Sequence, residues 1–256
     1  MTDPTPSSPF DLQGRCAVVT GASRGIGRAI ALGLSRAGAE VVLVGRPGSN
    51  DATREAVVGL GGKVDVVELD MGDLGAVERV GAELAASRQV DVLVNNAGII
   101  DRQDTVDLSH EDWQRVLDVN LNGVFLLAQQ VGRTMVARGH GKIVSVASLL
   151  TFQGGIRVAS YAASKHAVAG LTKALANEWG PHGVQVNAIA PGYIATDNTA
   201  ALREDPDRSR SILERIPAGR WGDADDIAGA AVFLSSSAAD YVNGHVLVVD
   251  GGWMAR

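Results

Sequence analysis

The sequence predicts an α/β fold with a doubly wound, mainly parallel sheet of seven strands and helices on both faces. Short runs rich in Val and Ile alternate along the chain with longer segments of helical periodicity, and this alternation is typical of parallel strands joined by helical crossovers. The apolar runs are continuous, which indicates strands covered on both faces. A length of 256 residues is enough for one large domain with a well-buried core.

Seven segments are predicted as strands because they are short, apolar and rich in β-branched residues. They are residues 16–20, 41–44, 64–69, 90–94, 142–146, 184–188 and 246–249. Six longer segments are predicted as helices, several of them with Ser or Asp at the start as a cap. They are residues 27–37, 51–60, 73–87, 111–138, 160–180 and 223–235.

No composition break, linker or repeat divides residues 11–256, which we predict to form a single domain. Residues 1–10, rich in Pro, Ser and Thr, are predicted to be a disordered tail. The irregular stretch 191–217 is strongly charged and follows a predicted strand end. It is either a solvated surface helix or a mobile lid. We favour the lid, because long excursions at the carboxyl ends of strands tend to be functional.

Composition and charge exclude several classes of partner. The net charge is −6 and the Lys and Arg residues are scattered, which argues against binding to nucleic acid or to an anionic membrane. The apolar runs are shorter than the roughly 20 residues of a membrane span, and the N-terminus lacks a secretory signal. The chain has one cysteine, which fits a cytoplasmic protein. No histidine pairs with another His or Cys at ligand spacing, so no metal site is predicted.

A glycine-rich turn, TGASRGIG at residues 20–27, joins the first predicted strand to the first helix. Such a turn is often only structural. Between a strand and a helix, however, its glycines allow close approach to a pyrophosphate, and the helix N–H groups face the anion. This predicts a Rossmann-type dinucleotide site. The residues predicted to bind the cofactor here are Gly21, Ser23, Arg24, Gly25, Ile26 and Gly27.

The end of the second strand bears on the choice between NAD and NADP. An acidic residue here would bind a free ribose 2′-hydroxyl and repel a 2′-phosphate. The sequence has Gly45 and then Arg46. Arg46, together with Arg24, could clamp a 2′-phosphate, or both could simply face solvent. The residues therefore favour NADP.

Two further strand ends are predicted to line the cofactor. Asp70, with Met71 beside it, follows the third strand and could accept a hydrogen bond from the adenine amino group; capping of the helix near Asp73 is the alternative. The fourth strand ends in NNAG, where small residues let a cofactor pass close and asparagines can tie neighbouring strands together. From this motif Asn96, Ala97 and Gly98 are predicted to contact the cofactor.

A candidate catalytic group lies beyond the fifth strand. Tyr161 and Lys165 are four residues apart on one helix and therefore share a face. An ammonium beside a phenol favours the phenolate and lowers its pKa from about 10. Lys165 together with a cationic nicotinamide could lower it far enough for Tyr161 to act as the general base for an alcohol proton. Ser148, at a strand end, would hold the substrate oxygen. Asn120 is predicted to hold a water against Lys165, because a mid-helix Asn needs a polar role. Taken alone, the Tyr–Lys pair is more often structural.

Together these motifs, in this order along residues 11–256, resemble the short-chain dehydrogenase/reductase family. The resemblance implies a catalytic tetrad of Asn120, Ser148, Tyr161 and Lys165, with Tyr161 and Lys165 also contacting the cofactor. It further implies a homotetramer built on the helix that begins near Tyr161. The residues implied to flank the nicotinamide amide are Pro191, Gly192, Ile194 and Thr196.

Five segments resemble one group within this family, the sugar-acid dehydrogenases. These enzymes are called 2-deoxy-D-gluconate 3-dehydrogenases or 2-dehydro-3-deoxy-D-gluconate 5-dehydrogenases. The segments are residues 152–158, 174–179, 191–196, 216–222 and 250–256. That resemblance implies an oxidoreductase acting on a secondary alcohol or ketone of a sugar acid. It favours NAD, against the indication from Arg46. The chain departs from the group at Asp101-Arg102, where two basic residues are expected.

A sugar acid needs a cation for its carboxylate. We expect Arg157 to supply it, with Arg102 as the second candidate; either could instead form an ordinary surface ion pair. Gln153, Tyr193 and Ser148 are further candidates for substrate contacts. The alternatives are a 3-oxoacyl-carrier-protein reductase, another polyol dehydrogenase, or a dinucleotide-sensing protein without turnover.

Overall fold

A single parallel sheet organises the chain in the computed structural model, which describes residues 8–256. Its seven strands stand in the order β3-β2-β1-β4-β5-β6-β7, and all six neighbouring pairs are parallel. The order reverses between β1 and β4, which creates the crevice where such folds bind ligands. The predicted fold and all seven predicted strands are confirmed. The strands are β1 (Cys16–Thr20), β2 (Glu40–Gly45), β3 (Val64–Glu68), β4 (Val92–Asn95), β5 (Gly141–Val146), β6 (Val184–Pro191) and β7 (Val246–Val249).

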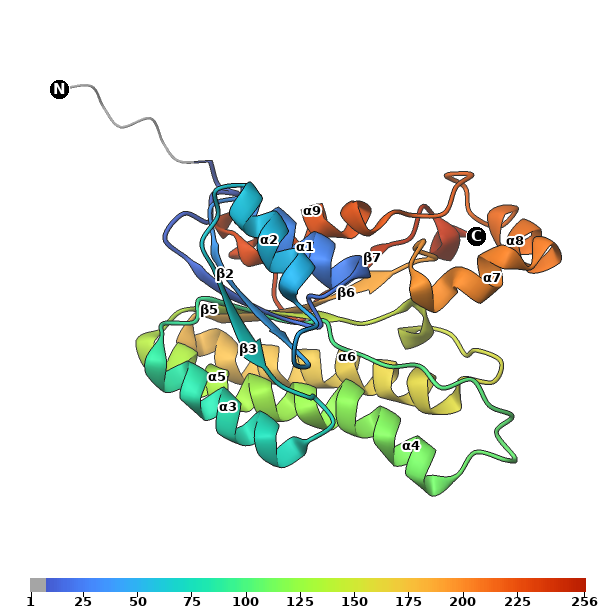
Figure 1. Cartoon of the computed structure of the whole chain (residues 1–256), viewed down its shortest axis with the longest axis horizontal. Coiled ribbons are helices and arrows are strands. Elements are labelled where there is room, and N and C mark those ends of the chain that lie inside the picture. The colour runs from blue at the N-terminus through green and yellow to red at the C-terminus, as the bar shows by residue number, and fades with distance from the viewer. Residues whose placement is uncertain (1–7) are drawn as a thin grey trace.

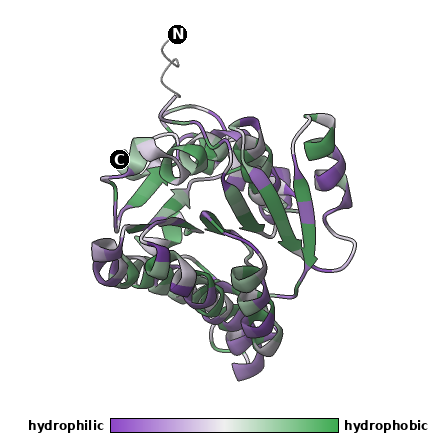
Figure 2. Ribbon diagram, turned by 90° about the vertical axis from the view of Figure 1, so that its left-hand side faces the viewer, coloured by the Kyte–Doolittle hydropathy of each residue, from purple (hydrophilic) through white to green (hydrophobic). Residues whose placement is uncertain are grey.

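Helices cover both faces of the sheet (Figure 1). One face carries α1 (Gly25–Arg36), α2 (Asp51–Gly59) and α9 (Ala224–Ser235). The other carries α3 (Leu74–Ser87), α5 (Gly123–Arg138) and α6 (Ala159–Trp179). Each face has its own apolar core, one around Ile30 and Ile227 and the other around Leu127 and Met135. The apolar strands between the two helical layers are clear in Figure 2.

The long helix predicted over residues 111–138 is interrupted. The segment consists of α4 (His110–Leu117), a π-helical turn η1 (Asp118–Asn122) and then α5. A π-turn inserts one extra residue into a helix and is frequent at functional sites. Asn120 lies in this turn and is almost fully buried, so the prediction of one continuous helix was wrong at the residue of most interest.

Burial on both faces holds for the central strands and fails at the edges. In β3, Asp65, Val66 and Glu68 are exposed, and all four residues of β7 are only partly buried. An edge strand lies beyond the cover of the helical layers, so a Val-rich run there does not become fully buried.

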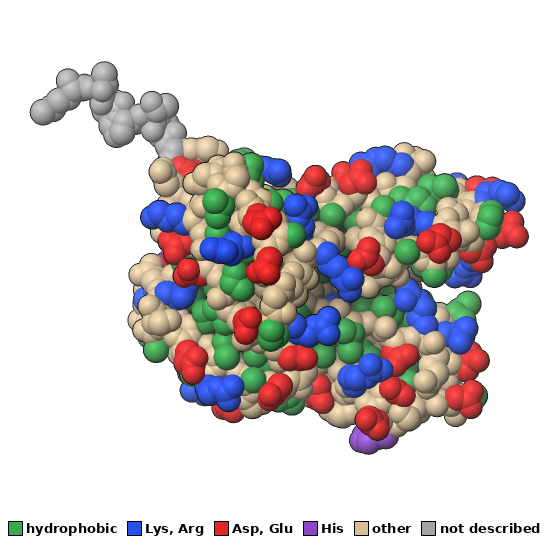
Figure 3. Space-filling model, in the orientation of Figure 1, with side chains coloured by type: hydrophobic (Ala, Val, Ile, Leu, Met, Phe, Trp, Pro, Cys, Tyr) green, Lys and Arg blue, Asp and Glu red, His purple; other side chains and the backbone are tan. Residues whose placement is uncertain are grey.

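Residues 191–217 contain more helix than predicted. They include η4 (Asp197–Thr199), α7 (Ala200–Glu204) and α8 (Pro206–Leu213). Asp205 caps α8 by accepting hydrogen bonds from the backbone N–H groups of Asp207 and Arg208. These helices form an arm at the right of Figure 1, and the surface is hollowed beneath it in Figure 3, with Lys and Arg side chains along the opening.

Pro9 and Phe10 pack against the C-terminal end of α9 and the residues that follow it. Residues 1–7 of the predicted tail lie outside the described residues. The Pro9 carbonyl accepts hydrogen bonds from Ala238 N–H (3.1 Å) and from the Ser237 hydroxyl (3.0 Å), and the Phe10 ring lies 6.4 Å from that of Phe233. Pro9 and Phe10, which the prediction placed in the tail, therefore pack against the domain. Across residues 8–256, no helix combines the length and the apolar character needed to cross a lipid bilayer.

Candidate active site

The turn between β1 and α1 is shaped so that it can hold a phosphate. Gly21 and Gly25 have positive φ angles of 64° and 52°. At Gly27, an added Cβ would lie 2.2 Å from the Gly21 carbonyl oxygen and 2.3 Å from Asn96 Nδ2, so no side chain fits there. Helix α1 begins with no acidic residue in its first turn and no side-chain cap from Arg24. Its first N–H groups are thus left for an anion, and the cradle fits a dinucleotide pyrophosphate.

The other residues predicted to contact the cofactor at this end of the sheet differ in their exposure. Ser23 is partly exposed, and Ile26 packs against the core beneath α1. Arg24 is exposed, but its Nη1 pairs with Asp197 Oδ2 at 2.9 Å. Arg46 is exposed at the end of β2, and within residues 8–256 no ion pair engages it.

Asn96 joins the ends of β4 and β1, as predicted for the asparagines. Its Nδ2 donates to the carbonyls of Thr20 (2.9 Å) and Gly21 (3.1 Å). In return, Thr20 Oγ1 accepts the N–H groups of Asn96 and Ala97, both at 3.0 Å. Gly98 follows, and an added Cβ there would lie 3.3 Å from Asn120 Oδ1 and 3.7 Å from Lys165 Nζ. This loop therefore runs directly beside the candidate catalytic group.

The two residues after β3 have local contacts. Asp70 is exposed and its Oδ1 accepts the Gly72 N–H at 2.9 Å, which stabilises its own turn. The capping role considered for Asp70 belongs to Asp73, which accepts the Ala76 N–H. Met71 is buried, and its side chain packs beside Gly123 in the core, so only its backbone is available to a cofactor.

The structure brings the four predicted catalytic residues together. Ser148 follows β5, Tyr161 and Lys165 project from the first turns of α6, and Asn120 comes from the π-turn. Lys165 Nζ donates to the Val146 carbonyl oxygen at 2.6 Å and lies 5.5 Å from the centre of the Tyr161 ring. Ser148 lies near enough to the Tyr161 hydroxyl to favour its phenolate. The sequence did not indicate the role of the Val146 carbonyl, because no side chain marks it.

Asn120 has the polar role that a mid-helix Asn requires, and its direct partners lie on two other segments of the chain. Its Oδ1 accepts the Ile99 N–H (2.8 Å), and its Nδ2 donates to the Ile99 carbonyl (2.9 Å) and to Ser164 Oγ (3.1 Å). The side chain therefore fastens the π-turn to the segment after β4 and to α6, and the water predicted between Asn120 and Lys165 stays a prediction. The sequence analysis missed Ser164, although its position directly before Lys165 was a usable signal.

Burial governs the charges of Tyr161 and Lys165. It raises the pKa of Tyr161, opposed by the hydrogen bond from Ser148 and by the charge of Arg102. Burial also lowers the pKa of Lys165 to about 8. In the protein without cofactor, desolvation penalises the phenolate and outweighs the favourable charges. The lowering of the Tyr161 pKa predicted for Lys165 together with a cationic nicotinamide stays a prediction.

The predicted substrate cations differ in their partners. Arg157, the first choice, pairs with Asp104 (Nε to Oδ1, 3.1 Å) and has a positive φ of 63°. Arg102 donates from Nη2 to the Asn198 carbonyl (3.1 Å), and its charge acts on Tyr161. The structure therefore favours Arg102 over Arg157.

Two further candidates are held by the C-terminal segment. Gln153 Nε2 donates to the sulfur of Met254 at 2.9 Å. Tyr193 packs against Trp221 and Trp253, with ring centres 5.6 and 4.6 Å apart, and burial raises its pKa.

The residues implied to flank the nicotinamide form a strap from β6 to the phosphate loop. Pro191 pairs with Val249 of β7, and an added Cβ at Gly192 would lie 2.6 Å from Asp250 Cα. Ile194 is buried and bridges to Gly222. Thr196 Cγ2 comes within 3.3 Å of where a Cβ on Gly25 would lie.

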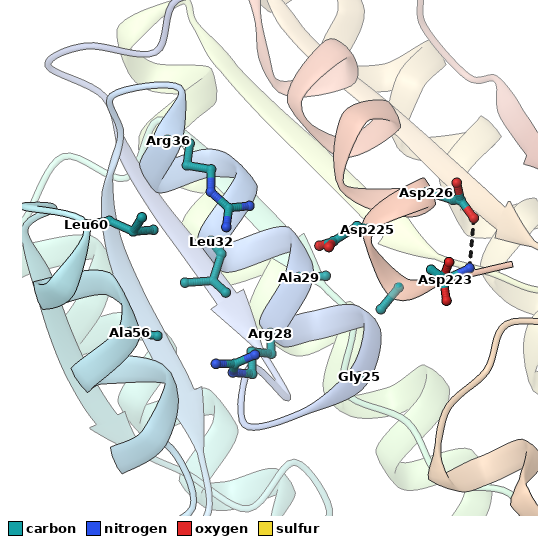
Figure 4. A pocket seen from close by; sticks show the side chains of 11 residues that line it. Gly25, Arg28, Ala29, Leu32, Arg36, Ala56, Leu60, Asp223, Asp225 and Asp226 are labelled. Carbon is teal, nitrogen blue, oxygen red and sulfur yellow. Dashed lines mark hydrogen bonds between the residues drawn. The ribbon is translucent and has the colours of Figure 1, made fainter.

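A surface groove lies away from these residues. A groove of about 760 Å³ runs along the outer side of α1, with Arg28 and Arg36 on α1 and Asp225 on α9 among its lining residues (Figure 4). Of the predicted site residues it includes only Gly25. We place the active site at the converging polar groups and not in this groove.

Comparison with known proteins identifies the family. The family model described as Enoyl-(Acyl carrier protein) reductase matches residues 21–254. The chain is 56% identical over 247 residues to the 2-dehydro-3-deoxy-D-gluconate 5-dehydrogenase of Bacillus subtilis (strain 168), covering 96% of the chain and 97% of the relative. The chain belongs to the short-chain dehydrogenase/reductase family.

Solved structures of family members agree over nearly the whole chain. A Beutenbergia cavernae protein solved with NADP bound at low occupancy is 55% identical, with a TM-score of 0.96 and coverage of 97% of this chain and 100% of that one. A gluconate 5-dehydrogenase from Burkholderia cenocepacia J2315, in complex with NADP and tartrate, is 42% identical, with a TM-score of 0.92 and coverage of 97% and 98%.

Proposed function

We propose that the chain is an NAD(P)-dependent dehydrogenase that moves a hydride between the nicotinamide and a secondary alcohol or ketone of a sugar acid. The observation that carries the proposal is the convergence of Tyr161, Ser148 and Lys165 beside the phosphate loop, with Arg102 acting on the same hydroxyl. Relatives named 2-dehydro-3-deoxy-D-gluconate 5-dehydrogenase, at 47–56% identity, support the substrate class.

The chain's own residues handle the proton and the orientation. When bound, the cofactor supplies or accepts the hydride. Tyr161 takes the alcohol proton during oxidation and returns it during reduction. Ser148, beside the Tyr161 hydroxyl, orients the substrate oxygen. The Val146 carbonyl holds the Lys165 ammonium beside the Tyr161 ring, and the positive charge favours the phenolate. Lys165 keeps this charge below a pH of about 8.

Arg102 is proposed to bind the substrate carboxylate. Loss of one charge-assisted hydrogen bond costs roughly 1.5–3 kcal/mol, so Arg102→Ala should raise KM for the sugar acid by about 10- to 100-fold while leaving cofactor affinity unchanged. Arg157→Ala is the matched control, because it removes a guanidinium that is paired with Asp104. A large rise in KM for the Arg157 variant, with none for the Arg102 variant, would reverse the assignment.

NADP(H) is proposed as a cofactor that the chain accepts. Support comes from Gly45 and Arg46 in place of an acid at the end of β2 and from the NADP found in related structures. The test follows the absorbance of reduced nicotinamide with 2-deoxy-D-gluconate and a panel of polyols, separately with NAD and NADP. Turnover of polyols but not of sugar acids would keep the enzyme class and overturn the substrate class.

The same panel addresses the alternatives. A 3-oxoacyl-carrier-protein reductase structure from Agrobacterium tumefaciens is 35% identical to this chain, below the identity of the sugar-acid enzymes. Reduction of an acetoacetyl thioester in preference to any sugar acid would favour that activity. Hydride transfer to any substrate excludes a purely sensing protein.

A homotetramer in the cytoplasm is also proposed. His166, Gly170 and Ala174 recur every four residues on α6 and are exposed, so one face of this helix is available for a subunit contact. Cys16 is a free thiol, as is usual in a reducing compartment. Light scattering coupled to gel filtration measures the subunit number, and a monomer would contradict the proposal.

A further inference from the structure

The short turn η4, with Asn198 at its middle, lies between the two sides of the candidate cleft and is held from both. On one side, Asp197 Oδ2 accepts from Arg24 Nη1 of the phosphate loop at 2.9 Å. On the other, the Asn198 carbonyl accepts from Arg102 Nη2 at 3.1 Å. These are contacts between residues 173 and 96 positions apart in the chain, so they fix this turn across the fold.

Both of these arginines have a second use. Arg24 stands at the start of α1 beside the anion cradle, and the Gly21 N–H donates to Val44 O at 2.8 Å, which sets this loop against the end of β2 that carries Arg46. Arg102 acts on Tyr161. Each cation can therefore serve either η4 or an incoming anionic ligand.

We propose that η4 is a latch that occupies Arg24 and Arg102 in the free enzyme, and that Asp197 competes with the cofactor's 2′-phosphate for Arg24. NADP(H) binding draws Arg24 away and releases the arm formed by α7 and α8, whereas NAD(H) leaves the ion pair in place. Asp197 is thus a positioning residue that links the choice of cofactor to the position of the arm. This inference rests on the proposed cofactor site.

The strength of the latch suits such an exchange. The side chains of Arg24 and Asp197 are 72% and 71% exposed, and ion pairs this exposed are weak. A phosphate with about two negative charges is a stronger partner for a guanidinium than a solvated carboxylate. The arm beyond the latch rests mainly on the small cluster around Ile212, Ile216 and Trp253, separate from both main cores.

Asp197→Asn tests the latch, because it keeps the size of the side chain and removes its charge. The matched control is Asp207→Asn, which removes an exposed carboxylate paired with Arg210 inside α8, without a contact to the phosphate loop. We expect Asp197→Asn to lower Kd for NADP about two- to fivefold, with a smaller change for NAD. Asp207→Asn should change neither constant.

Two further measurements separate the latch from a general charge effect. In an Arg24→Gln background, Asp197→Asn should no longer change Kd for NADP, as a double-mutant cycle requires for coupled residues. In the cofactor-free protein, hydrogen exchange of residues 198–213 should be faster in Asp197→Asn than in the wild type or in Asp207→Asn.

An unchanged or raised Kd for NADP in Asp197→Asn, or a fall that persists without Arg24, would overturn the competition. Unchanged hydrogen exchange would overturn the latch. Neither readout requires turnover, so a failed sugar-acid assay leaves the inference standing. Absence of any NADP binding would instead count against the proposed cofactor.

Discussion

The catalytic group and the arm above it are held in opposite ways. Asn120 and Lys165 are almost completely buried, and their side chains bond to backbone atoms at strand ends and on adjoining segments. The arm carrying α7 and α8 is charged and exposed, and it meets the phosphate loop through an ion pair between two solvated side chains. Buried polar bonds keep reacting groups in register, whereas weak surface bonds let a segment yield to a ligand. The buried catalytic group is therefore held in a fixed geometry, whereas the arm can move to admit a ligand.

The largest effect should come from the buried side. Tyr161→Phe removes the hydroxyl that exchanges the proton, and loss of a general acid–base group costs about 10²–10⁴-fold in kcat. Kd for NADP should change little, because the cradle of glycines is untouched. Steady-state kinetics with a fluorescence titration of NADP separates the two quantities.

Tyr241→Phe is the control for this change, since Tyr241 is fully exposed. It should retain wild-type kcat. A Tyr161→Phe enzyme that keeps more than about a tenth of wild-type kcat would remove Tyr161 from the chemistry.

A second, smaller effect should appear in stability rather than in rate. Lys165 is 4% exposed and its pKa is lowered from 10.5 to about 8 by burial. Between pH 8 and 10.5 the unfolded chain thus binds more protons at this residue than the folded chain, so stability rises with pH across this window. The wild type should gain up to about 3 kcal/mol relative to Lys165→Met between these limits.

Urea unfolding of both proteins at pH 7.5 and at pH 10 measures this difference, and the comparison cancels the titration of all other groups. A difference that stays constant with pH would show that Lys165 is not desolvated. Lys165→Met should also lose most of its turnover. The buried charge of Lys165 would then destabilise the free protein but be needed for catalysis.

Local sequence patterns were sufficient for the sheet and for much of the site. The predicted strands hold because continuous Val and Ile runs pack well between helices, and Gly27 was predictable because its loop has a fixed geometry. The π-turn was not predictable, because its buried Asn120 is bonded to the Ile99 backbone, 21 residues away, and a local pattern does not show such a contact. Judged from the local sequence pattern alone, residues 111–138 are still better predicted as a single helix than as two helices joined by a π-turn.

Charges were harder to predict than positions. The sequence places Tyr161 near Lys165, but it does not show how far burial opposes ionisation of the phenol. The sequence also leaves open which residues pair with Arg24 and Arg157, and the structure shows that Asp197 and Asp104 do. Long-range pairing of exposed groups depends on tertiary structure, which composition and spacing do not encode.

The smallest effect should arise at the start of α9, where Asp226 holds Arg220. Asp226 accepts two hydrogen bonds from Arg220 (2.7 and 2.9 Å) and one from the Asp223 N–H (2.7 Å), and these contacts lower its pKa to about 2. Its stabilisation is therefore present above about pH 4 and is lost as pH falls towards 2. Because the group is exposed, Asp226→Asn should cost only about 1 kcal/mol at pH 7.

Thermal unfolding at pH 7 and at pH 3 tests this prediction against Asp225→Asn, which removes a neighbouring acid from the same helical turn. Only the Asp226 variant should approach the wild type in stability as the pH falls, since protonation removes the same bonds that the substitution removes. A destabilisation that does not change with pH would mean that packing, and not the charge of Asp226, holds Arg220 to α9. The arm would then have a rigid base, and the difference between it and the buried catalytic group would rest on the latch alone.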